Sequence, residues 1–339
     1  MTEVVVIGAG LAGSVLTEQL HARGVTVQWW DAGEEGRASS CPCALVHPFA
    51  GRSFQPRPDV FEAWVHARRF LRALGPAAQV HEATIVRRIG DDDAGRRLWS
   101  SWNRHESQLR AIWDGELEVG TAPDGARTIA YGPVFGVSLA GAVAQVHARL
   151  RARGLAPRRL TVDRIVREGE GWAVRDAGGG APTGAAHVVV AAGAGTRTLL
   201  AGHAGAPSLE HVEGTLGHGR AQPLPEFFVD GGHVASTAQT VGWGASYRML
   251  DRPDPRTHET QLHAIAARLE ARVPRWPEPS EIWRGVRVVD PHRRRPFVGP
   301  VGPATGGLWA MTAFGSQGAL WIPWAAARLA QRLANLSSD

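Results

Sequence analysis

Three glycines near the start of the chain have the spacing of a phosphate-binding turn. Gly8, Gly10 and Gly13 form a G-x-G-x-x-G pattern, and Asp31 follows them at a distance that leaves room for a helix and a strand. The glycines allow a tight turn and close approach of the backbone to a pyrophosphate, while the acid can accept hydrogen bonds from both ribose hydroxyls. A carboxylate at this place would repel a 2′-phosphate. The pattern therefore predicts binding of an adenine dinucleotide other than NADP.

The elements around these glycines make a complete βαβ unit. Val4–Ile7 is a β-branched run that leads directly into the glycines, and apolar residues then recur at helical spacing from Leu11 until Gly24. Val25–Trp30 reads as a second strand and ends at Asp31. The unit places the glycine turn at a helix N-terminus, where free N–H groups and a partial positive charge favour an anion.

Two further segments, far along the chain, read as buried strands of the same domain. His187–Val190 is followed by the small-residue turn Ala191–Gly195. Leu308–Met311 is followed by a glycine-containing turn and then by an amphipathic helix over Ala319–Leu333. The βαβ unit is instead followed by the loop 38–58, which is rich in Ser, Pro and Cys and shows little periodicity. Because no regular series of βαβ units completes a nicotinamide domain, the pattern favours FAD over NAD.

The length of 339 residues is enough for about two domains. We expect an α/β protein in which a Rossmann-like FAD-binding domain, assembled from separated segments, carries an inserted α+β substrate domain. The FAD-binding domain is expected over 1–57, 133–205 and 285–339, and the substrate domain over 58–132 and 206–284. Within the insert, we predict helices over Pro58–Leu74 and from Asp91–Asp93 to Trp113, and a strand over Val80–Ile89.

Composition excludes several classes of chemistry. The 37 basic residues are all Arg, so Schiff bases on Lys and the Lys of a P-loop are impossible. Cys41 and Cys43 are the only cysteines, which rules out a framework of disulfides and leaves a zinc site incomplete. The chain also shows no signal-peptide pattern and no apolar run of membrane-spanning length. We therefore expect a cytoplasmic protein with neither a metal site nor a membrane partner.

Several motifs together resemble a known group of flavoenzymes. The glycine fingerprint, the strand before Gly195 and three later motifs are similar to the D-amino-acid oxidase and glycine oxidase superfamily over nearly the whole chain. Within it, the chain most resembles the C-terminal oxidase domain of bifunctional tRNA 5-methylaminomethyl-2-thiouridine biosynthesis proteins. The motifs that carry these resemblances are Ala38–Ser39, Ala44–Leu45, Gly242–Tyr247, Gly285–Arg287, Arg295–Pro300 and Ala313–Gly318.

The resemblance implies an FAD-dependent enzyme that oxidises the C–N bond of an amine bearing a carboxymethyl group. The donor would be carboxymethylaminomethyl uridine at the wobble position of tRNA, or a free small amine such as glycine, sarcosine or a D-amino acid. A flavin-binding subunit without turnover is a third alternative. With tRNA as substrate, the arginines within 149–159 and 293–295 would contact phosphates; with a free amine they would be solvated.

The resemblance also assigns roles to individual residues. Arg287 matches the arginine that grips the substrate carboxylate, a task that suits a planar guanidinium. Tyr247 would line the substrate site and hydrogen-bond the substrate. Gly315–Gly318 opens the last helix, and its N–H groups would stabilise negative charge on the reduced flavin. The residues expected at FAD are Gly8, Gly10, Leu11, Ala12, Gly13, Asp31, Ala38, Ser39, Val162, Ala192, Gly193, Gly315, Ser316, Gln317 and Gly318.

The loop with both cysteines would pass near the flavin ring. Some members of the superfamily attach FAD through Cys or His, and Cys41, Cys43 and His47 lie in this loop. Small thiols and a loop histidine that only pack against their neighbours are the favoured interpretation, so we expect FAD to be held without a covalent bond.

Overall fold

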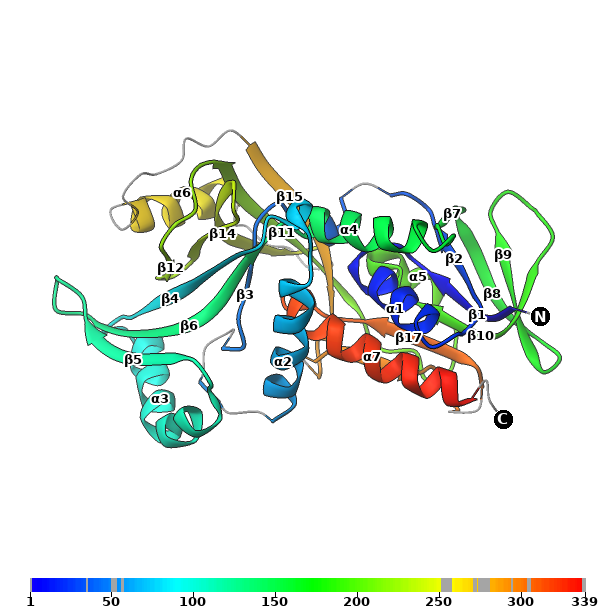
Figure 1. The fold of residues 1–339 in the computed structure, drawn as a ribbon, viewed down its shortest axis with the longest axis horizontal. Coiled ribbons are helices and arrows are strands. Elements are labelled where there is room, and N and C mark those ends of the chain that lie inside the picture. Colours follow the sequence, from blue (N-terminus) through cyan, green and yellow to red (C-terminus); the bar gives the residue numbers. More distant parts are fainter. Residues whose placement is uncertain are drawn as a thin grey trace.

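The chain folds around two β-sheets that lie side by side along the long axis of the molecule (Figure 1). The computed structural model describes residues 2–34, 36–49, 54–55, 58–250, 258–270, 273, 281–293, 295–303 and 306–336. Both ends of the chain lie at the same end of the molecule, beside the first sheet (Figure 1).

The first sheet contains eight strands and has a parallel centre. Its main order is β16-β17-β10-β1-β2-β7, and β8 and β9 extend it from β10. Three distant pieces of the chain supply the parallel neighbours β17, β10 and β1, as the sequence predicts. The strands are β1 (Thr2–Ile7), β2 (Val27–Asp31), β7 (Arg158–Arg159), β8 (Val162–Glu168), β9 (Gly171–Asp176), β10 (Thr183–Val190), β16 (Phe297–Pro300) and β17 (Leu308–Thr312).

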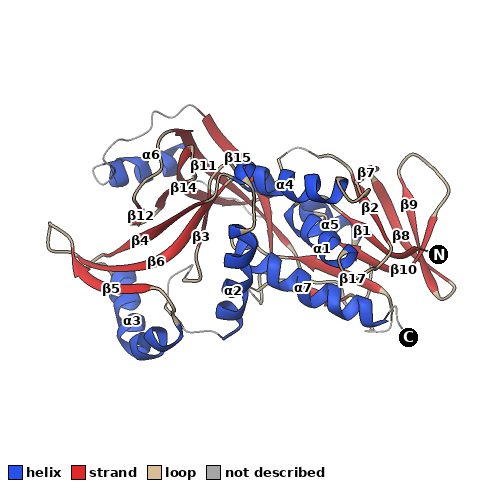
Figure 2. Ribbon diagram, in the orientation of Figure 1, coloured by secondary structure: helices blue, strands red, loops and turns tan. Residues whose placement is uncertain are grey.

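Helices α1 (Leu11–His21), α4 (Leu139–Arg151) and α7 (Gly318–Leu336) pack together beside the first sheet (Figure 2). The central strands are apolar on both faces; Val4, Val5 and Val6 are fully buried. Such continuous apolar runs are typical of parallel strands that are covered on both sides. A short helix α5 (Thr196–Leu199) and the 3₁₀ turn η3 (Gly193–Gly195) follow β10.

The second sheet contains nine strands in a mixed arrangement. Its order is β15-β11-β14-β13-β12-β4-β6-β3, with β5 paired to β6, and its pairs are antiparallel except for β12 with β4. The strands are β3 (Ala44–Val46), β4 (His81–Ile89), β5 (Glu116–Thr121), β6 (Arg127–Val137), β11 (Glu210–Arg220), β12 (Glu226–Val229), β13 (His233–Ser236), β14 (Thr240–Met249) and β15 (Glu281–Val289).

Helices α3 (Asp93–Ile112) and α6 (His258–Leu269) belong to the half of the molecule built on the second sheet (Figure 1). Helix α2 (Pro58–Arg72) lies between the halves: it packs against α7, and its Trp64 contacts Trp113 and Phe135. The 3₁₀ turn η1 (Ala38–Ser40) lies between β2 and β3, and the 3₁₀ turn η2 (Pro76–Ala78) lies between α2 and β4. Asp92 caps α3 by accepting a hydrogen bond from the N–H of Gly95 at 2.7 Å, which confirms the helix start that the acidic run predicts. Trp102 and Trp113 are buried in an aromatic core with Tyr131, as expected of core residues.

Two expected domain boundaries fall inside strands of the second sheet, and one expected segment contributes to both sheets. Residues 133 and 285 lie inside β6 and β15, and both strands belong wholly to the second sheet. The aperiodic loop expected over 38–58 contains β3, which also pairs in the second sheet, so residues 1–57 do not stay with the first. Only three residues of β3 pair, which is too short a run to give a periodic signal. The expected boundary at 57 and Arg294 lie outside the described residues.

Candidate active site

At each of the three glycines after β1, a side chain would meet a different neighbour. Gly8 has a φ of +111°, and a Cβ on it would lie 2.4 Å from the carbonyl oxygen of Ala191. A Cβ on Gly13 would lie 1.9 Å from the carbonyl oxygen of Gly8, so this glycine lets α1 pack against the turn. A Cβ on Gly10 would meet only the side chain of Ser39, at 3.0 Å for Oγ. Gly10 is thus the position where absence of a side chain keeps space for a ligand.

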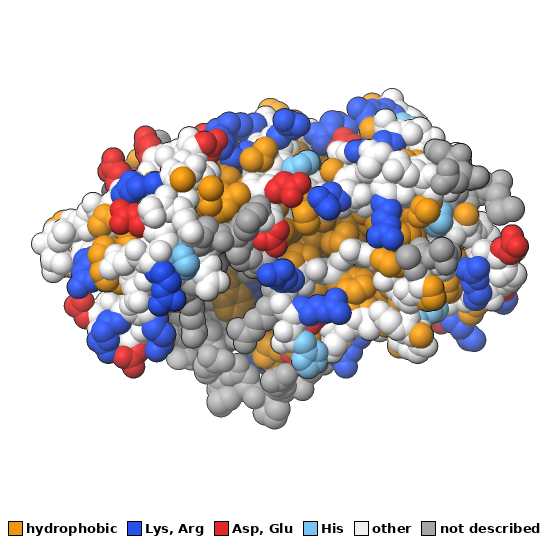
Figure 3. All heavy atoms as spheres, turned by 90° about the horizontal axis from the view of Figure 1, so that it is seen from below, with side chains coloured by type: hydrophobic (Ala, Val, Ile, Leu, Met, Phe, Trp, Pro, Cys, Tyr) orange, Lys and Arg blue, Asp and Glu red, His pale blue; other side chains and the backbone are white. Residues whose placement is uncertain are grey.

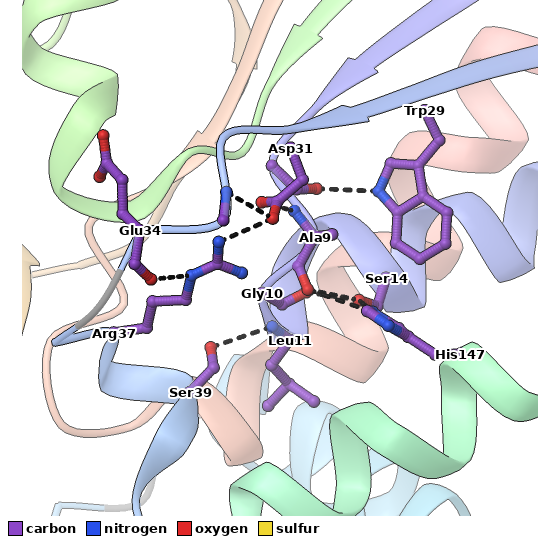
Figure 4. A network of polar contacts seen from close by, with 12 residues as sticks. Ala9, Gly10, Leu11, Ser14, Trp29, Asp31, Glu34, Arg37, Ser39 and His147 are labelled. Atoms are coloured by element: carbon purple, nitrogen blue, oxygen red, sulfur yellow. Dashed lines mark hydrogen bonds and ion pairs between the residues drawn. The ribbon is translucent and has the colours of Figure 1, made fainter. Parts of the chain in front are cut away.

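Asp31 ties the glycine turn to the segment that follows β2 (Figure 4). Its Oδ1 accepts from the N–H of Ala9 at 2.9 Å, and its Oδ2 accepts from the N–H of Gly33 at 3.0 Å. Nη2 of Arg37 also lies 2.7 Å from Oδ2, while Nε of Arg37 donates to the carbonyl of Glu34. The carboxylate offers about four acceptor positions. Three of these positions are in use here. Two hydroxyl groups of a ribose could therefore both donate to Asp31 only if one of them shares a position with Arg37 or displaces it. The sequence did not single out Arg37.

The turn η1 joins the glycine loop to the second sheet. Oγ of Ser39 accepts a hydrogen bond from the N–H of Leu11 at 3.0 Å, at the start of α1 (Figure 4). On the other side, the N–H of Val286 in β15 donates to the carbonyl of Gly36 at 3.1 Å. The segment around Ala38 and Ser39 therefore fixes the nucleotide loop relative to the strand that carries Arg287.

A cavity of about 1090 Å³ runs between the two sheets. Its wall includes the glycine loop, η1, the turn after β10, the start of α7 and the facing ends of β11, β14 and β15. The expected FAD residues that line it are Gly8, Gly10, Leu11, Ala12, Asp31, Ala38, Ser39, Val162, Ala192, Gly193, Gly315, Ser316, Gln317 and Gly318. Gly13 does not line it, because it faces the turn. Both expected substrate residues, Arg287 and Tyr247, lie on the wall as well.

Arg287 and Tyr247 meet across the strand that separates them. Gly214 in β11 pairs directly with Tyr247 in β14, and Arg287 in β15 pairs two positions away with Val212. The Arg287 guanidinium carbon lies 4.3 Å from the centre of the Tyr247 ring. A Cβ on Gly214 would lie 2.1 Å from Nη2 of Arg287, so the guanidinium passes directly over the backbone of β11. The sequence did not single out Gly214, since a strand glycine has several common explanations, but the structure shows that it leaves room for the Arg287 side chain.

The guanidinium of Arg287 is short of hydrogen-bond partners within the protein. Its Nε and Nη2 are buried and have no partner among the described residues. A buried donor without a partner costs about 1–3 kcal/mol, and more when it is charged. The Tyr247 ring compensates through a cation–π contact, which leaves the N–H groups available for an anion. Such an arrangement suits an anion, and its planar donors match the geometry of a carboxylate.

The start of α7 lines the cavity at the same edge of the first sheet as the glycine loop, because β17 and β1 both run parallel to β10. Ala313 and Gly315 have φ angles of +61° and +55°, and the N–H of Gly315 donates to the carbonyl of Val288 at 3.0 Å. This tight turn brings Gly315–Gly318 onto the cavity wall beside β15. Free N–H groups at a helix start favour a partial negative charge.

The two thiols are buried and protonated at neutral pH. Cys41 and Cys43 line the cavity, and burial raises the pKa of the Cys41 thiol to about 11 and that of the Cys43 thiol further. A thiol is nucleophilic as its thiolate. The geometry agrees with cysteines that pack, which is the interpretation the sequence favours. Among the described residues, no group of three or more His, Cys, Asp or Glu side chains is placed to hold a metal ion.

Comparison with known families shows which cofactor the chain uses. The family model described as FAD dependent oxidoreductase matches residues 3–332. The chain belongs to this family. FAD is its cofactor, and the residues present fit that group, with an acid at the end of β2, an open glycine cradle at Gly10 and a long cavity that continues to the second sheet. No helix in the described ranges has the length and hydropathy to cross a lipid bilayer.

The curated relatives are longer proteins. The tRNA 5-methylaminomethyl-2-thiouridine biosynthesis bifunctional protein of Caulobacter vibrioides is 28% identical over 342 residues, which cover 98% of this chain and 54% of that protein. The protein of the same name from Paracidovorax citrulli is 30% identical over 371 residues, which cover 94% of this chain and 55% of that protein. The chain thus spans about half the length of the curated relatives it matches.

Solved structures share the fold. An iminodiacetate oxidase from Chelativorans has a TM-score of 0.77 at 18% identity, and the match covers 97% of this chain and 94% of that one. A glycine oxidase from Geobacillus kaustophilus has a TM-score of 0.77 at 20% identity, with the same coverage. These likenesses confirm the expected α/β fold with a Rossmann-like FAD-binding part and a second part.

Proposed function

We propose that this chain oxidises the C–N bond of an amine that carries a carboxymethyl group, and that Arg287 holds the carboxylate. The observation that carries the proposal concerns Arg287, which lines the cavity: its Nε and Nη2 atoms are buried and have no partner among the described residues. A planar guanidinium can donate two parallel hydrogen bonds to one carboxylate. Such a grip fixes both the charge and the direction of the adjacent carbon.

The protein's own groups would contribute position and electrostatics. Bound FAD supplies the hydride acceptor. Arg287, whose guanidinium packs over the Tyr247 ring, orients the carboxylate so that the adjacent C–H bond is held in one direction. The N–H groups at the start of α7 would favour negative charge on a ligand at that part of the cavity wall. The oxidised carbon then forms an imine, and water splits it to the free amine and an oxo acid.

Two donors fit this chemistry. Carboxymethylaminomethyl uridine in tRNA is supported by the names of the relatives that match nearly the whole chain. A free small amine is supported by the position of Arg287, whose donors are buried in a cavity between two sheets. On the face drawn in Figure 3, arginines are spread across the whole width and hydrophobic side chains gather in the middle, so this face has no single cationic tract.

Anaerobic reduction of the flavin tests the proposal. The purified holoenzyme is mixed with glycine, sarcosine, D-amino acids or bulk modified tRNA, each at low and high salt, and bleaching of the flavin absorbance is followed. Sarcosine is compared with dimethylamine, which lacks the carboxylate. We expect bleaching by at least one carboxymethyl amine and none by its counterpart without the carboxylate.

The outcomes separate the donors. Bleaching by a free amine at both salt concentrations would assign the small-molecule reaction. Bleaching only by tRNA and only at low salt would assign the nucleic-acid substrate, because phosphate contacts weaken steeply with salt. Equal bleaching by dimethylamine and sarcosine would contradict the proposed role of the carboxylate.

A further inference from the structure

The cavity continues beyond Arg287 into a second polar region. His47, which follows β3, Arg87 in β4 and His233 in β13 all line the same cavity as Arg287. Strands β4 and β13 and the residue after β3 thus bring a guanidinium and two imidazoles to the same cavity. We call these three residues the distal cluster. The reaction proposed above uses none of them.

The side chains of the distal cluster are buried or partly buried, and contacts with the protein hold Arg87 and His47 in place. Arg87 is only 9% exposed, its Nη1 donates to the carbonyl of Phe49 at 3.0 Å, and its guanidinium lies over the Phe54 ring. The hydroxyl of Tyr131, which is fully buried, lies 2.9 Å from Nδ1 of His47. Aromatic packing and these polar contacts hold the cationic side chain in place at the wall of the cavity.

The distal cluster lies close enough to Arg287 for their charges to interact. Burial, with the Arg87 charge and His233 adding to it, lowers the pKa of His47 to about 3. Burial and the Arg287 charge lower the pKa of His233 to about 4. Both imidazoles are therefore neutral at pH 7, and the positive charge of this wall is carried by the two guanidinium groups.

Charges on the substrate half of the cavity are predominantly positive. Among the described residues of the second sheet and its helices, the lining contains four arginines and two aspartates. Both aspartates have other roles, because Asp92 caps α3 and Asp230 lies 3.6 Å from Arg88. When Arg287 binds one substrate carboxylate, the other arginines of the lining still give this part of the cavity a positive charge. Low-dielectric walls focus such a field into the cavity.

The geometry points to a second anion subsite at His47, Arg87 and His233, which would take a second carboxylate of a small amine dicarboxylate while Arg287 holds the first. The inference rests on the proposed function and names its substrate class as N-carboxymethyl amino acids. The neutral imidazoles can donate or accept hydrogen bonds beside the guanidinium. The reacting C–N bond would then lie between two anchored acids, which orients it at both ends.

Binding of unreactive analogues tests the subsite without turnover. The holoenzyme is titrated by calorimetry with (carboxymethylthio)alkanoates that have one to four methylenes before the second carboxylate. Each is paired with the alkylthioacetate of equal length, which lacks that carboxylate. We expect at least one dicarboxylate to bind about ten-fold or more tightly than its partner, and this ratio to fall to about one in Arg87→Met.

Two further variants keep the test decisive if Arg87→Met folds poorly. His233→Leu and His47→Leu each remove an imidazole and leave Arg87, so we expect the ratio to fall about three-fold or more in each. Arg248→Met is the matched control, since Arg248 is an exposed arginine of β14 paired with Glu213. It should keep the native ratio.

The results distinguish the failure of each idea. If alkylthioacetates bind and the second carboxylate never adds affinity, the subsite is overturned and the role of Arg287 stands. If the ratio is high but unchanged in all three variants, the second carboxylate binds elsewhere and the subsite is likewise overturned. If neither series binds, the carboxylate site at Arg287 itself fails, and the proposed function fails with it.

Discussion

A single glycine decides where the guanidinium of Arg287, the group proposed to bind the substrate, lies. The Arg287 guanidinium reaches Tyr247 by passing over Gly214, where a Cβ would lie 2.1 Å from Nη2 and 2.7 Å from Cζ. The obstructing atoms belong to the end of a flexible side chain, so a methyl group there would move the guanidinium and not the sheet. The structure therefore separates the cost to binding from the cost to folding.

Gly214→Ala is expected to raise KM for a carboxymethyl amine by about ten-fold or more, which is 1.36 kcal/mol or more of lost binding. The melting temperature should change little and FAD should stay bound. Gly184→Ala is the matched control, because a Cβ at Gly184 in β10 meets nothing within 4 Å. Steady-state kinetics on both variants make the comparison. An unchanged KM in Gly214→Ala would show that the contact over β11 has no role in binding.

The buried thiols should be inert in the folded protein. With the pKa of Cys41 raised to about 11 and that of Cys43 further, far fewer than about one thiol in a hundred is ionised at pH 7.5. We expect no alkylation by iodoacetamide at pH 7.5 and rapid alkylation of both in urea, read by intact mass. Acid precipitation should release all FAD. Rapid labelling of the folded protein, or FAD retained in the pellet, would contradict this description of the cysteines.

At the scale of elements, the strand–turn–helix unit at the N-terminus was predictable because it is local. The run Val4–Ile7, the glycines and the helical spacing up to Gly24 together define β1, the turn and α1, and the ends agree within a few residues. The start of α3 was equally clear from its acidic cap. The strand β3 could not be predicted, since three residues gain their hydrogen bonds from β6, more than eighty positions away in sequence, and carry no periodic signal of their own.

The link between β2 and the glycine turn is carried by Asp31. Its carboxylate accepts from the N–H groups of Ala9 and Gly33 and faces Arg37 (Figure 4). Asp31→Ala is expected to weaken FAD binding by about ten- to a hundred-fold, because hydrogen bonds to a charged group contribute about 1.5–3 kcal/mol. Fluorescence titration of the apoprotein with FAD measures this.

Glu168→Ala is the control for that change. Glu168 forms an exposed ion pair with Arg175 between β8 and β9 and does not line the cavity. An exposed pair contributes at most about 1 kcal/mol, so this variant should bind FAD like the native protein. Equal FAD affinity in Asp31→Ala and Glu168→Ala would remove Asp31 from the cofactor site.

At the scale of the whole molecule, the cavity arises from how the two sheets meet. Residues far apart in sequence, such as Asp31, Tyr247 and Gly315, share one wall because the turn η1 and the strand β15 join the sheets. Motifs in the sequence identified 14 of the 15 residues expected at FAD, and both expected substrate residues, correctly as lining this cavity. The sequence could not reveal Arg37, Gly214, Arg87 or His233, because their positions depend on the pairing of strands and on the packing of aromatic side chains.

The domain boundaries also depend on strand pairing, which the sequence did not reveal. The tripeptide at Gly285 was interpreted as the return to the FAD-binding part, but β15 pairs with β11 along its whole length. The strand that carries the proposed carboxylate grip thus belongs to the second sheet, and its end reaches the first through the turn that begins α7. A sequence motif marks the residues of a site more reliably than it marks the sheet to which they belong.

The central claim is that Arg287 holds the carboxylate of the donor. The direct measurement is the rate of anaerobic flavin reduction against concentration of the carboxymethyl amine that bleaches the native enzyme, compared for native protein, Arg287→Lys and Arg287→Met, each with its FAD content determined. We predict an apparent Kd raised about a hundred-fold in Arg287→Met, or about 2.7 kcal/mol. Arg287→Lys should be intermediate, since it keeps the charge without the planar fork. Full FAD content with the same concentration dependence in all three proteins would contradict the account.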